Sequence, residues 1–417
     1  MAEKRIVLGN CGKTDPQDIE SYLKVGGFKA YEKARRMKPK AIVEEVKKSG
    51  LTGRGGAGFN CGLKWELAMN AKGRQKYLIC NADEGEVGAF KDKYILSHDP
   101  FGLIEGMIIA GLAIGARKAY IYLRGEYHPL KGLLVSAIGQ ASGKGYLKDM
   151  DIQVFEGAGA YVCGEESALM NSIEGQRGES RYKPPYPPQR GLWDMPTIIN
   201  NVETLMNIPH IVNNGAAWFS AMGAGRSKGT KVFSVSGDVA GPGIYEMEMG
   251  STLKELVVGL AGAADIKAVQ IGGATGNIIP GYMIDTPLSH ETFLGSGAVM
   301  VFNSTRDIID IVHNDIRFLN EESCGKCTPC REGTEVMLEI YGRLQQGDGR
   351  ERDISTLEEL ARTMAAASLC GLGQAAAVPV LDSLRYFYNE YIDRVNQSQF
   401  LRSYLGGELV VSKEGIR

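Results

Sequence analysis

The chain has 417 residues, a formal net charge of −2, and 44% hydrophobic against 23% charged residues. This length allows two or three domains with a large buried core, and the composition is that of an ordinary globular protein. Because charges of both signs are interspersed, nothing favours a nucleic acid or an anionic membrane surface as a partner.

Two segments bear on targeting and membrane insertion. The N-terminus MAEKRIVLGN lacks the apolar core of a signal peptide. The most apolar run, LIEGMIIAGLAIGA at 103–116, is too short for a bilayer span and contains Glu105, so it predicts a buried helix. We therefore expect a cytoplasmic chain without direct membrane insertion, a location that includes the cytoplasmic side of a membrane complex.

The stretch LTGRGGAGF at 51–59 contains the pattern G-x-G-x-x-G at Gly53, Gly55 and Gly58. That pattern marks a Rossmann dinucleotide site only when a strand precedes it. The preceding segment KPKAIVEEVKKSG has helical periodicity instead, with proline at its start and glycine at its end. A Rossmann turn is therefore not predicted, although the bare backbone still allows a flat ligand or phosphates to approach N–H groups.

Residues 1–228 predict an α/β domain. Its strands are expected within QKYLICNADE, KAYIYLRGEY and DIQVFEGAGAYVCGEE, and each runs into a polar or glycine-rich loop. Open α/β sheets place their ligands at such strand ends. Residues 229–312 predict a small β-grasp-like module, with strands in TKVFSVSGDVAGPGIYEMEMG, KAVQIGG and GAVMVFNS and a short helix capped by Ser251.

Residues 313–417 predict a helical bundle, because three amphipathic segments follow one another: TEVMLEIYGRLQQG, ISTLEELARTMAAAS and VPVLDSLRYFYNEYIDRV. Next to them lies a C-x2-C-x2-C run of Cys324, Cys327 and Cys330, with Cys370 further along. Three closely spaced thiolates plus a distant fourth favour a 4Fe–4S cluster over a structural zinc site, which stays the alternative. The remaining cysteines are expected to be small buried hydrophobes: Cys11, Cys61, Cys80 and Cys163.

Acid and amide side chains gather in three loops of the first domain, within CNADEGEVGAFKDK, GAGAYVCGEES and IINNVET. Taken alone, each loop has the amino-acid composition of an ordinary turn. Together, their amides and carboxylates can bond a planar heterocycle or a ribityl chain, while glycine N–H groups and Lys64 meet a phosphate.

Several motifs together resemble one family, the NADH-oxidising flavoprotein subunit of respiratory complex I and of related NAD-linked hydrogenases and formate dehydrogenases. They span nearly the whole chain in the family's order: GRGGAGF, GLKW, YLICNADEGE, IYLRGEY, GAGAYVCGEES, KPPYPP, NNVET and ESCGKCTPCREG. The resemblance implies an α/β FMN-binding domain, a ubiquitin-like β-grasp domain of the soluble-ligand-binding type (SLBB), and a helical bundle carrying the cluster.

The resemblance also implies the site residues. It assigns FMN binding to Gly53, Arg54, Gly55, Gly56, Lys64, Asn81, Asp83, Glu84, Tyr161, Gly164, Glu165, Glu166, Asn200, Asn201 and Thr204. It assigns NADH binding to Phe59, Glu86, Lys183 and Tyr186, and it gives Glu86 and Glu166 the part closest to catalysis by orienting the nucleotide. The cluster ligands are Cys324, Cys327, Cys330 and Cys370. Because a carboxylate near the adenosine ribose repels a 2′-phosphate, Glu166 predicts NAD(H) rather than NADP(H).

The function implied is an NADH dehydrogenase (diaphorase) subunit, with hydride transfer between NAD(H) and FMN and single-electron transfer to the 4Fe–4S cluster. Its partners would be a thioredoxin-like 2Fe–2S subunit and further iron–sulfur or catalytic subunits. Asn60, Cys61, Gly85, Val87 and Leu67 depart from the complex I pattern, and the tail is closer to the hydrogenase and formate dehydrogenase versions. The alternatives are a flavin-free zinc-binding scaffold and a stand-alone NADH oxidase.

Overall fold

The computed structural model describes residues 3–395, which form two compact units. Within the described part, the first unit comprises residues 3–264, 271–273 and 284–301. The second comprises residues 265–270, 274–283 and 302–395. The predicted division into three domains, at residues 228 and 312, stays a prediction.

The first unit is built on a four-stranded parallel sheet in the order β3-β2-β1-β4. Its strands are β1 (Tyr77–Ala82), β2 (Lys118–Leu123), β3 (Asp151–Glu156) and β4 (Thr197–Asn201). The three strands predicted from the sequence are thus confirmed. Because all four strands run the same way, the loops that follow them leave from one edge of the sheet, where such sheets hold ligands.

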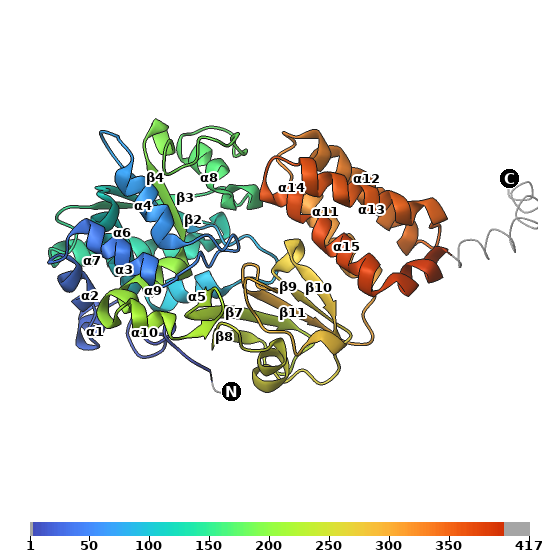
Figure 1. Cartoon of the computed structure of the whole chain (residues 1–417), viewed down its shortest axis with the longest axis horizontal. Helices are drawn as coiled ribbons and strands as arrows, with labels where there is room; N and C mark the ends of the chain where they lie inside the picture. The colour runs from blue at the N-terminus through green and yellow to red at the C-terminus, as the bar shows by residue number, and fades with distance from the viewer. Residues whose placement is uncertain (1–2, 396–417) are drawn as a thin grey trace, which may run out of the picture. The chain divides into compact units, whose positions relative to one another are not determined.

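Helices pack around this sheet (Figure 1). They are α1 (Ile19–Lys24), α2 (Lys29–Ala34), α3 (Pro39–Lys48), α4 (Cys61–Asn70), α5 (Lys91–His98), α6 (Pro100–Ile114), α7 (Lys131–Gly143), α8 (Glu166–Ile173), α9 (Val202–Asn214) and α10 (Ala216–Ser220). The glycine stretch lies between α3 and α4, so the prediction that it is not a Rossmann turn is confirmed. Cys11, Cys61, Cys80 and Cys163 are buried, as predicted.

Helix α6 is the predicted buried helix, and nearly all of its residues are inaccessible. Its single carboxylate has a structural role. Glu105 accepts hydrogen bonds from the Tyr22 hydroxyl (2.5 Å) and from the backbone N–H groups of Phe28 and Tyr31 (2.9 Å each). Burial raises the pKa of Glu105, while these donors lower it. The carboxylate therefore anchors the start of α2 to the core.

Within residues 3–395, no single helix combines the length and apolar composition of a membrane span. Helices α5 and α6 pass that test only as a pair, and the pair is bent by 98°.

A second, mixed sheet has the order β10-β9-β11-β7-β8. Its strands are β7 (Thr230–Gly237), β8 (Gly243–Glu248), β9 (Ala268–Ile271), β10 (Asn277–Pro280) and β11 (Ala298–Phe302), and a short hairpin of β5 (Gly223–Ala224) and β6 (Ser227–Lys228) precedes them. The helix expected after β8 is instead a π-helical segment over Glu255–Leu260. Its cap differs from the prediction as well: Thr252, and not Ser251, accepts the Glu255 N–H at 3.2 Å.

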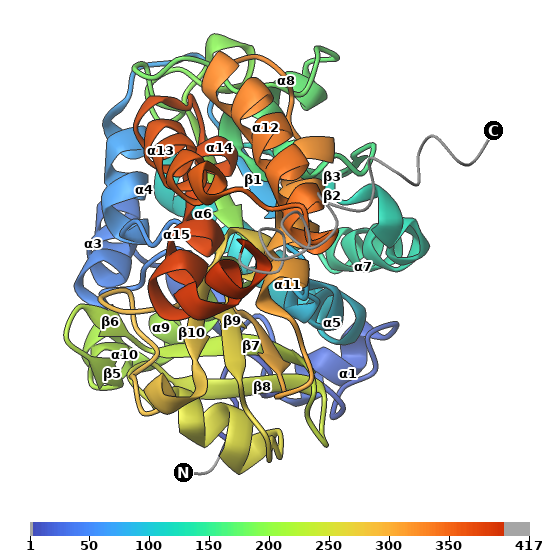
Figure 2. The same cartoon turned by 90° about the vertical axis from the view of Figure 1, so that its right-hand side faces the viewer.

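The helices of the second unit form the predicted bundle (Figure 2). They are α11 (Ile308–Glu321), α12 (Thr328–Gln345), α13 (Glu351–Ala367), α14 (Gly371–Ala375) and α15 (Ala377–Tyr386). Helix α11 runs across the domain boundary expected at residue 312. Residues 396–417, also assigned to the bundle from the sequence, lie outside the described residues.

Candidate functional site

Amide and carboxylate side chains lie at the carboxyl edge of the parallel sheet. Asn81, the next-to-last residue of β1, lies directly opposite Asn201, which ends β4. Asp83 and Glu84 follow β1, and Thr204 lies in the first turn of α9. The sheet register therefore brings together two of the three loops that the sequence predicted to meet.

The third loop is tied to the same edge by direct contacts. The Asn81 side chain donates to the carbonyl of Gly164 (2.9 Å), at the end of the 3-10 turn Tyr161–Gly164. The Asn81 amide oxygen accepts the Asp83 N–H (3.1 Å). A Cβ on Gly164 would lie 3.5 Å from the Asp83 carbonyl oxygen, in ordinary van der Waals contact, so the loops of Gly164 and Asp83 are neighbours.

The glycine stretch, which connects α3 to α4, also lies against this edge. A Cβ on Gly55 would lie 3.1 Å from the Cβ of Asn201, and the hydroxyl of Thr204 accepts the Arg54 N–H at 2.8 Å. Gly58 has a φ of +65°, and a Cβ there would lie 2.7 Å from Nδ1 of His290. Close backbone approach, rather than a Rossmann turn, therefore accounts for these glycines.

The Arg54 side chain is buried and turns away from the sheet edge. Its guanidinium donates to the Thr52 hydroxyl (2.7 Å) and to the Lys228 carbonyl (2.5 Å). Burial lowers the pKa of Arg54, whereas the carboxylate of Glu203 raises it. Arg54 thus binds Thr204 of α9 through its backbone N–H, and the hydrogen bonds of its guanidinium connect the glycine stretch to Lys228.

Glu165 and Lys183 form an ion pair, and further hydrogen-bond donors surround the Glu165 carboxylate. The Glu165 carboxylate accepts Lys183 Nζ (2.6 Å), the Ser180 hydroxyl (2.8 Å) and the N–H groups of Ser167 and Ala168 (3.0 Å each). Burial acts to raise the pKa of Glu165, but Lys183 and the hydroxyl donors outweigh it and hold the pKa below its usual range. This carboxylate is ionised and fixed at the start of α8.

Glu166, the next residue, has a different environment. It pairs with Lys64 of α4, and Lys64 also donates to the Ile199 carbonyl in β4 (2.7 Å). One third of the Glu166 side chain is exposed, against 14% of the Lys64 side chain. The pair thus presents a carboxylate to solvent while its lysine is held against the sheet.

The other two predicted acids, Glu84 and Glu86, contact different parts of the fold. Glu84 accepts the N–H groups of Asp92 and Lys93 and the Tyr127 hydroxyl (2.9 Å each), so it caps α5. Burial, with repulsion from Asp92, raises the pKa of Glu84 to about 7. Glu86 accepts the Tyr161 hydroxyl at 2.7 Å, which links two of the predicted nucleotide residues.

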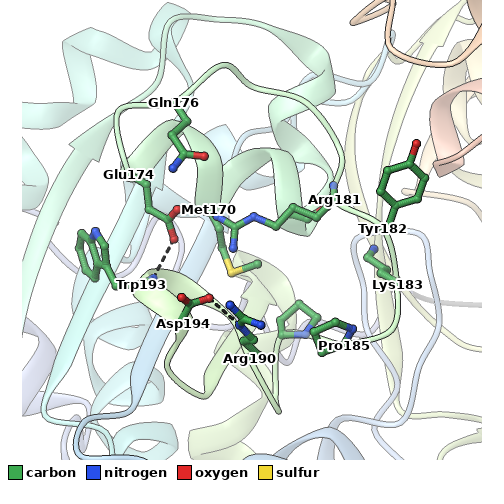
Figure 3. Close-up of a pocket in the computed structure, with 12 residues that line it drawn as sticks. Met170, Glu174, Gln176, Arg181, Tyr182, Lys183, Pro185, Arg190, Trp193 and Asp194 are labelled. Carbon is green, nitrogen blue, oxygen red and sulfur yellow. Dashed lines mark hydrogen bonds and ion pairs between the residues drawn. The ribbon is translucent and has the colours of Figure 1, made fainter.

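A cavity of about 510 Å³ opens beside Lys183 (Figure 3). Arg181 lines it and donates to Glu174 (2.7 Å) and Asn171 (2.7 Å). The predicted NADH residues Phe59 and Tyr186 do not line this cavity, and each is 54% exposed. The remaining lining residues were not expected from the sequence, since only packing brings them together: Ser167, Met170, Gln176, Tyr182, Pro185, Pro187, Arg190, Trp193 and Asp194.

Sequence analysis also missed Arg124, which follows β2 at the same sheet edge. Its Nη2 pairs with Glu126 (2.5 Å), while its Nη1 is buried without a hydrogen-bond partner among residues 3–395. A Cβ on Gly85 would lie 2.3 Å from that nitrogen. A buried cationic donor next to a bare backbone suits an anionic or carbonyl-bearing planar ligand, so the residues present fit the predicted flavin.

The four predicted cluster cysteines belong to the second unit. Cys327 and Cys370 directly precede α12 and α14, Cys330 lies in the first turn of α12, and Cys324 is in the loop after α11. Burial and the neighbouring thiols raise the pKa of Cys330 to about 11, although the Ser323 hydroxyl (3.3 Å from its sulfur) lowers it. Within the described residues, no three His, Cys, Asp or Glu side chains meet the geometry for binding a single metal ion.

Comparison with known proteins decides the family. Residues 46–210 match the Nuo51 FMN-binding domain, and residues 310–394 match the NADH-ubiquinone oxidoreductase-F iron–sulfur binding region. The NADP-reducing hydrogenase subunit HndC of Solidesulfovibrio fructosivorans is 41% identical, over 95% of this chain and 84% of its own. The second F-type subunit of the NADH-quinone oxidoreductase of Rhizobium meliloti is also 41% identical, over 94% and 98%.

The chain belongs to the family of the F-type subunits of complex I and the related subunits of hydrogenases. The predicted family, the NADH oxidoreductase function, and the FMN and 4Fe–4S cofactors are confirmed. The match over residues 310–394 decides between a 4Fe–4S cluster and the zinc alternative. The relatives are themselves subunits of larger complexes, so partner subunits are expected in general.

Solved structures of this family have the same fold. A crystal structure of NAD⁺-reducing [NiFe]-hydrogenase in the H2-reduced state aligns with a TM-score of 0.86 at 41% identity, over 90% of this chain and 66% of that chain. The air-oxidised state gives the same TM-score at 40% identity, over 94% and 67%. This chain therefore spans about two thirds of those hydrogenase chains, and the roles of single site residues stay predictions.

Proposed function

We propose that the carboxyl edge of the parallel sheet holds FMN and NADH, and that Cys324, Cys327, Cys330 and Cys370 ligate the 4Fe–4S cluster. The convergence of three loops and the glycine stretch on one sheet edge, through the Asn81–Gly164 and Arg54–Thr204 contacts, supports the first part. A bound FMN would supply the chemistry of hydride exchange with NADH and of single-electron transfer to the cluster. The protein's contribution is then to bind, orient and shield the reactants.

Different residues would contact the flavin, its phosphate and the NADH. Asn81, Asp83, Asn200 and Asn201 offer amide and carboxylate groups to the flavin ring and ribityl chain, while Lys64 and the glycine N–H groups meet the phosphate. Glu86, held by Tyr161, and Glu166, held by Lys64, orient NADH. Phe59 and Tyr186 supply exposed aromatic faces for the adenine.

We further propose that NAD(H) is preferred over NADP(H). Glu166 supports this preference, because its exposed carboxylate can bond ribose hydroxyls and repels a 2′-phosphate. The relatives include both an NADP-reducing hydrogenase subunit and NADH-quinone oxidoreductase subunits.

The larger assembly is proposed by analogy with those relatives. We infer a cytoplasmic complex in which a thioredoxin-like 2Fe–2S subunit and further iron–sulfur or catalytic subunits exchange electrons with the cluster. Complex I-like, hydrogenase-linked and formate dehydrogenase-linked complexes, including electron-bifurcating ones, all fit this site. The middle of the chain is proposed as an SLBB domain, supported by the mixed sheet order β10-β9-β11-β7-β8.

A visible absorption spectrum of the anaerobically purified chain, before and after NADH, tests the proposal. We expect flavin bands and a broad iron–sulfur shoulder, both bleached by NADH and not by NADPH. Cys370→Ser should remove the shoulder and keep the flavin bands, while Cys11→Ala, outside the ligand set, should keep both. A colourless zinc protein, or a flavin that NADH leaves oxidised, would overturn the proposal in favour of a scaffold.

A further inference from the structure

Ser368 has a hydrogen-bonding hydroxyl that the fold leaves unused. It follows the last turn of α13, two residues before Cys370, and is 5% exposed. Its Oγ is shielded from solvent and has no hydrogen-bond partner among residues 3–395. Leaving a buried hydroxyl unpaired costs about 1–3 kcal/mol, so an unpaired one calls for an explanation.

The backbone of Ser368 shows that its position is fixed. Its N–H donates to the Met364 carbonyl (3.0 Å), and its own carbonyl accepts the Gln374 side chain (2.9 Å). Another buried serine of this unit behaves differently: Ser383 donates to the Val380 carbonyl (2.8 Å) and bonds the Tyr391 hydroxyl (2.7 Å). A serine hydroxyl in a helix commonly donates to a backbone carbonyl of the preceding turn in this way.

Gly373 shows what the Ser368 hydroxyl faces. A Cβ built on Gly373 would lie 2.6 Å from the Ser368 Oγ and 2.9 Å from the Cβ of Cys330. The start of α14, the Ser368 hydroxyl and the Cys330 side chain therefore crowd around one point. The crowding leaves no room for a side chain at Gly373, and it places the unpaired hydroxyl beside a proposed cluster ligand.

We propose that the Ser368 hydroxyl donates a hydrogen bond to a sulfur at the 4Fe–4S site and thereby raises the reduction potential of the cluster. This inference rests on the proposed ligand set. Hydrogen bonds to the sulfurs stabilise the reduced cluster more than the oxidised one, because the reduced cluster carries more negative charge. Another hydroxyl already lies at this site: that of Ser323 is 3.3 Å from Cys330 Sγ.

The test is a redox titration of the full-length chain, purified anaerobically with its iron, in which the cluster is followed by electron paramagnetic resonance. Ser368→Ala should shift the midpoint potential of the cluster to more negative values at unchanged iron and flavin content. Ser368→Thr, which keeps a hydroxyl, should stay close to the wild type. Ser355→Ala, at an exposed serine of α13, is the matched control and should shift nothing.

An unchanged potential in Ser368→Ala, with full iron content, would overturn the inference. If the alanine variant loses iron, Ser368→Gly takes its place in the titration. Loss of iron from both, with iron retained in Ser368→Thr, would also overturn it, because the hydroxyl would then serve assembly rather than potential. Absence of iron from the wild-type chain is a separate failure, that of the proposed ligand set.

Discussion

At the residue scale, two adjacent carboxylates at the start of α8 have different roles. Glu165 accepts hydrogen bonds from Ser167, Ala168, Ser180 and Lys183, which engage both of its carboxylate oxygens. Glu166 pairs with Lys64 and keeps one third of its side chain exposed. Glu165 therefore fixes the loop, while Glu166 is the carboxylate that a nucleotide can meet.

This difference predicts the effect of Glu166→Gln. The variant removes the charge that repels a 2′-phosphate, so the ratio of kcat/KM for NADH to that for NADPH should fall about tenfold, equivalent to about 1.4 kcal/mol. Steady-state reduction of a dye by each nucleotide measures the ratio. Glu358→Gln, at an exposed glutamate of α13, is the control and should leave the ratio unchanged. Equal ratios in wild type and Glu166→Gln would remove Glu166 from nucleotide selection.

The environments of single side chains were the features least predictable from the sequence. Glycine and amide motifs identified the loops of the site, because their chemistry is local. The burial of the Arg54 side chain was not predictable, since it depends on Lys228, a partner far away in the sequence. The unpaired Nη1 of Arg124 was not predictable either, because only the fold brings it next to Gly85. Ser368 carries no signal of its own in the sequence, because only the packing of α14 makes its hydroxyl unusual.

At the scale of elements, the sequence was more informative. Parallel strands such as β1 are short apolar runs that end in polar loops, and both features can be recognised in the amino-acid sequence. The π-helical segment Glu255–Leu260 was expected as an ordinary helix, because hydrophobic periodicity does not distinguish an α-turn from a π-turn. Helix α11 begins at Ile308, before the region from residue 313 in which the sequence predicts helices, and element boundaries are the least reliable part of such predictions.

Packing between elements predicts a large effect at Gly106 in α6. A Cβ there would lie 2.3 Å from the Leu205 carbonyl oxygen in α9, a backbone atom that cannot move aside. Gly106→Ala should therefore lower the free energy of unfolding by at least about 2 kcal/mol. The first transition in urea, followed by circular dichroism, measures the change.

Gly139 in α7 provides the matched control. It is an exposed helical glycine with no atom within 4 Å of an added Cβ. Gly139→Ala should raise the free energy of unfolding by up to about 1 kcal/mol, because alanine loses less backbone entropy in a helix. Similar effects of the two substitutions would contradict the close approach of α6 and α9.

At the scale of the whole molecule, buried carboxylates link stability to pH. Glu246 of β8 accepts the N–H groups of Ile6, Val7 and Leu8 (2.8–3.0 Å) and the Thr230 hydroxyl (2.5 Å), so it fastens the N-terminal segment to the second sheet. Burial raises its pKa to about 7, although these donors lower it. The folded state therefore binds this proton more tightly than the unfolded state does.

The sign of the pH dependence follows from that difference. The stabilising contribution of protonated Glu246 is complete below pH 4.5, its unfolded value, and is lost as the pH rises through about 7. Glu246→Gln does not titrate, so between pH 5 and 8 the wild type should lose up to about 3 kcal/mol relative to the variant. Thermal unfolding of both proteins across this range measures the difference, and Glu32→Gln, at a half-exposed glutamate of α2, serves as the control. Parallel pH profiles for wild type and Glu246→Gln would show that this carboxylate is ionised throughout, held so by its four donors.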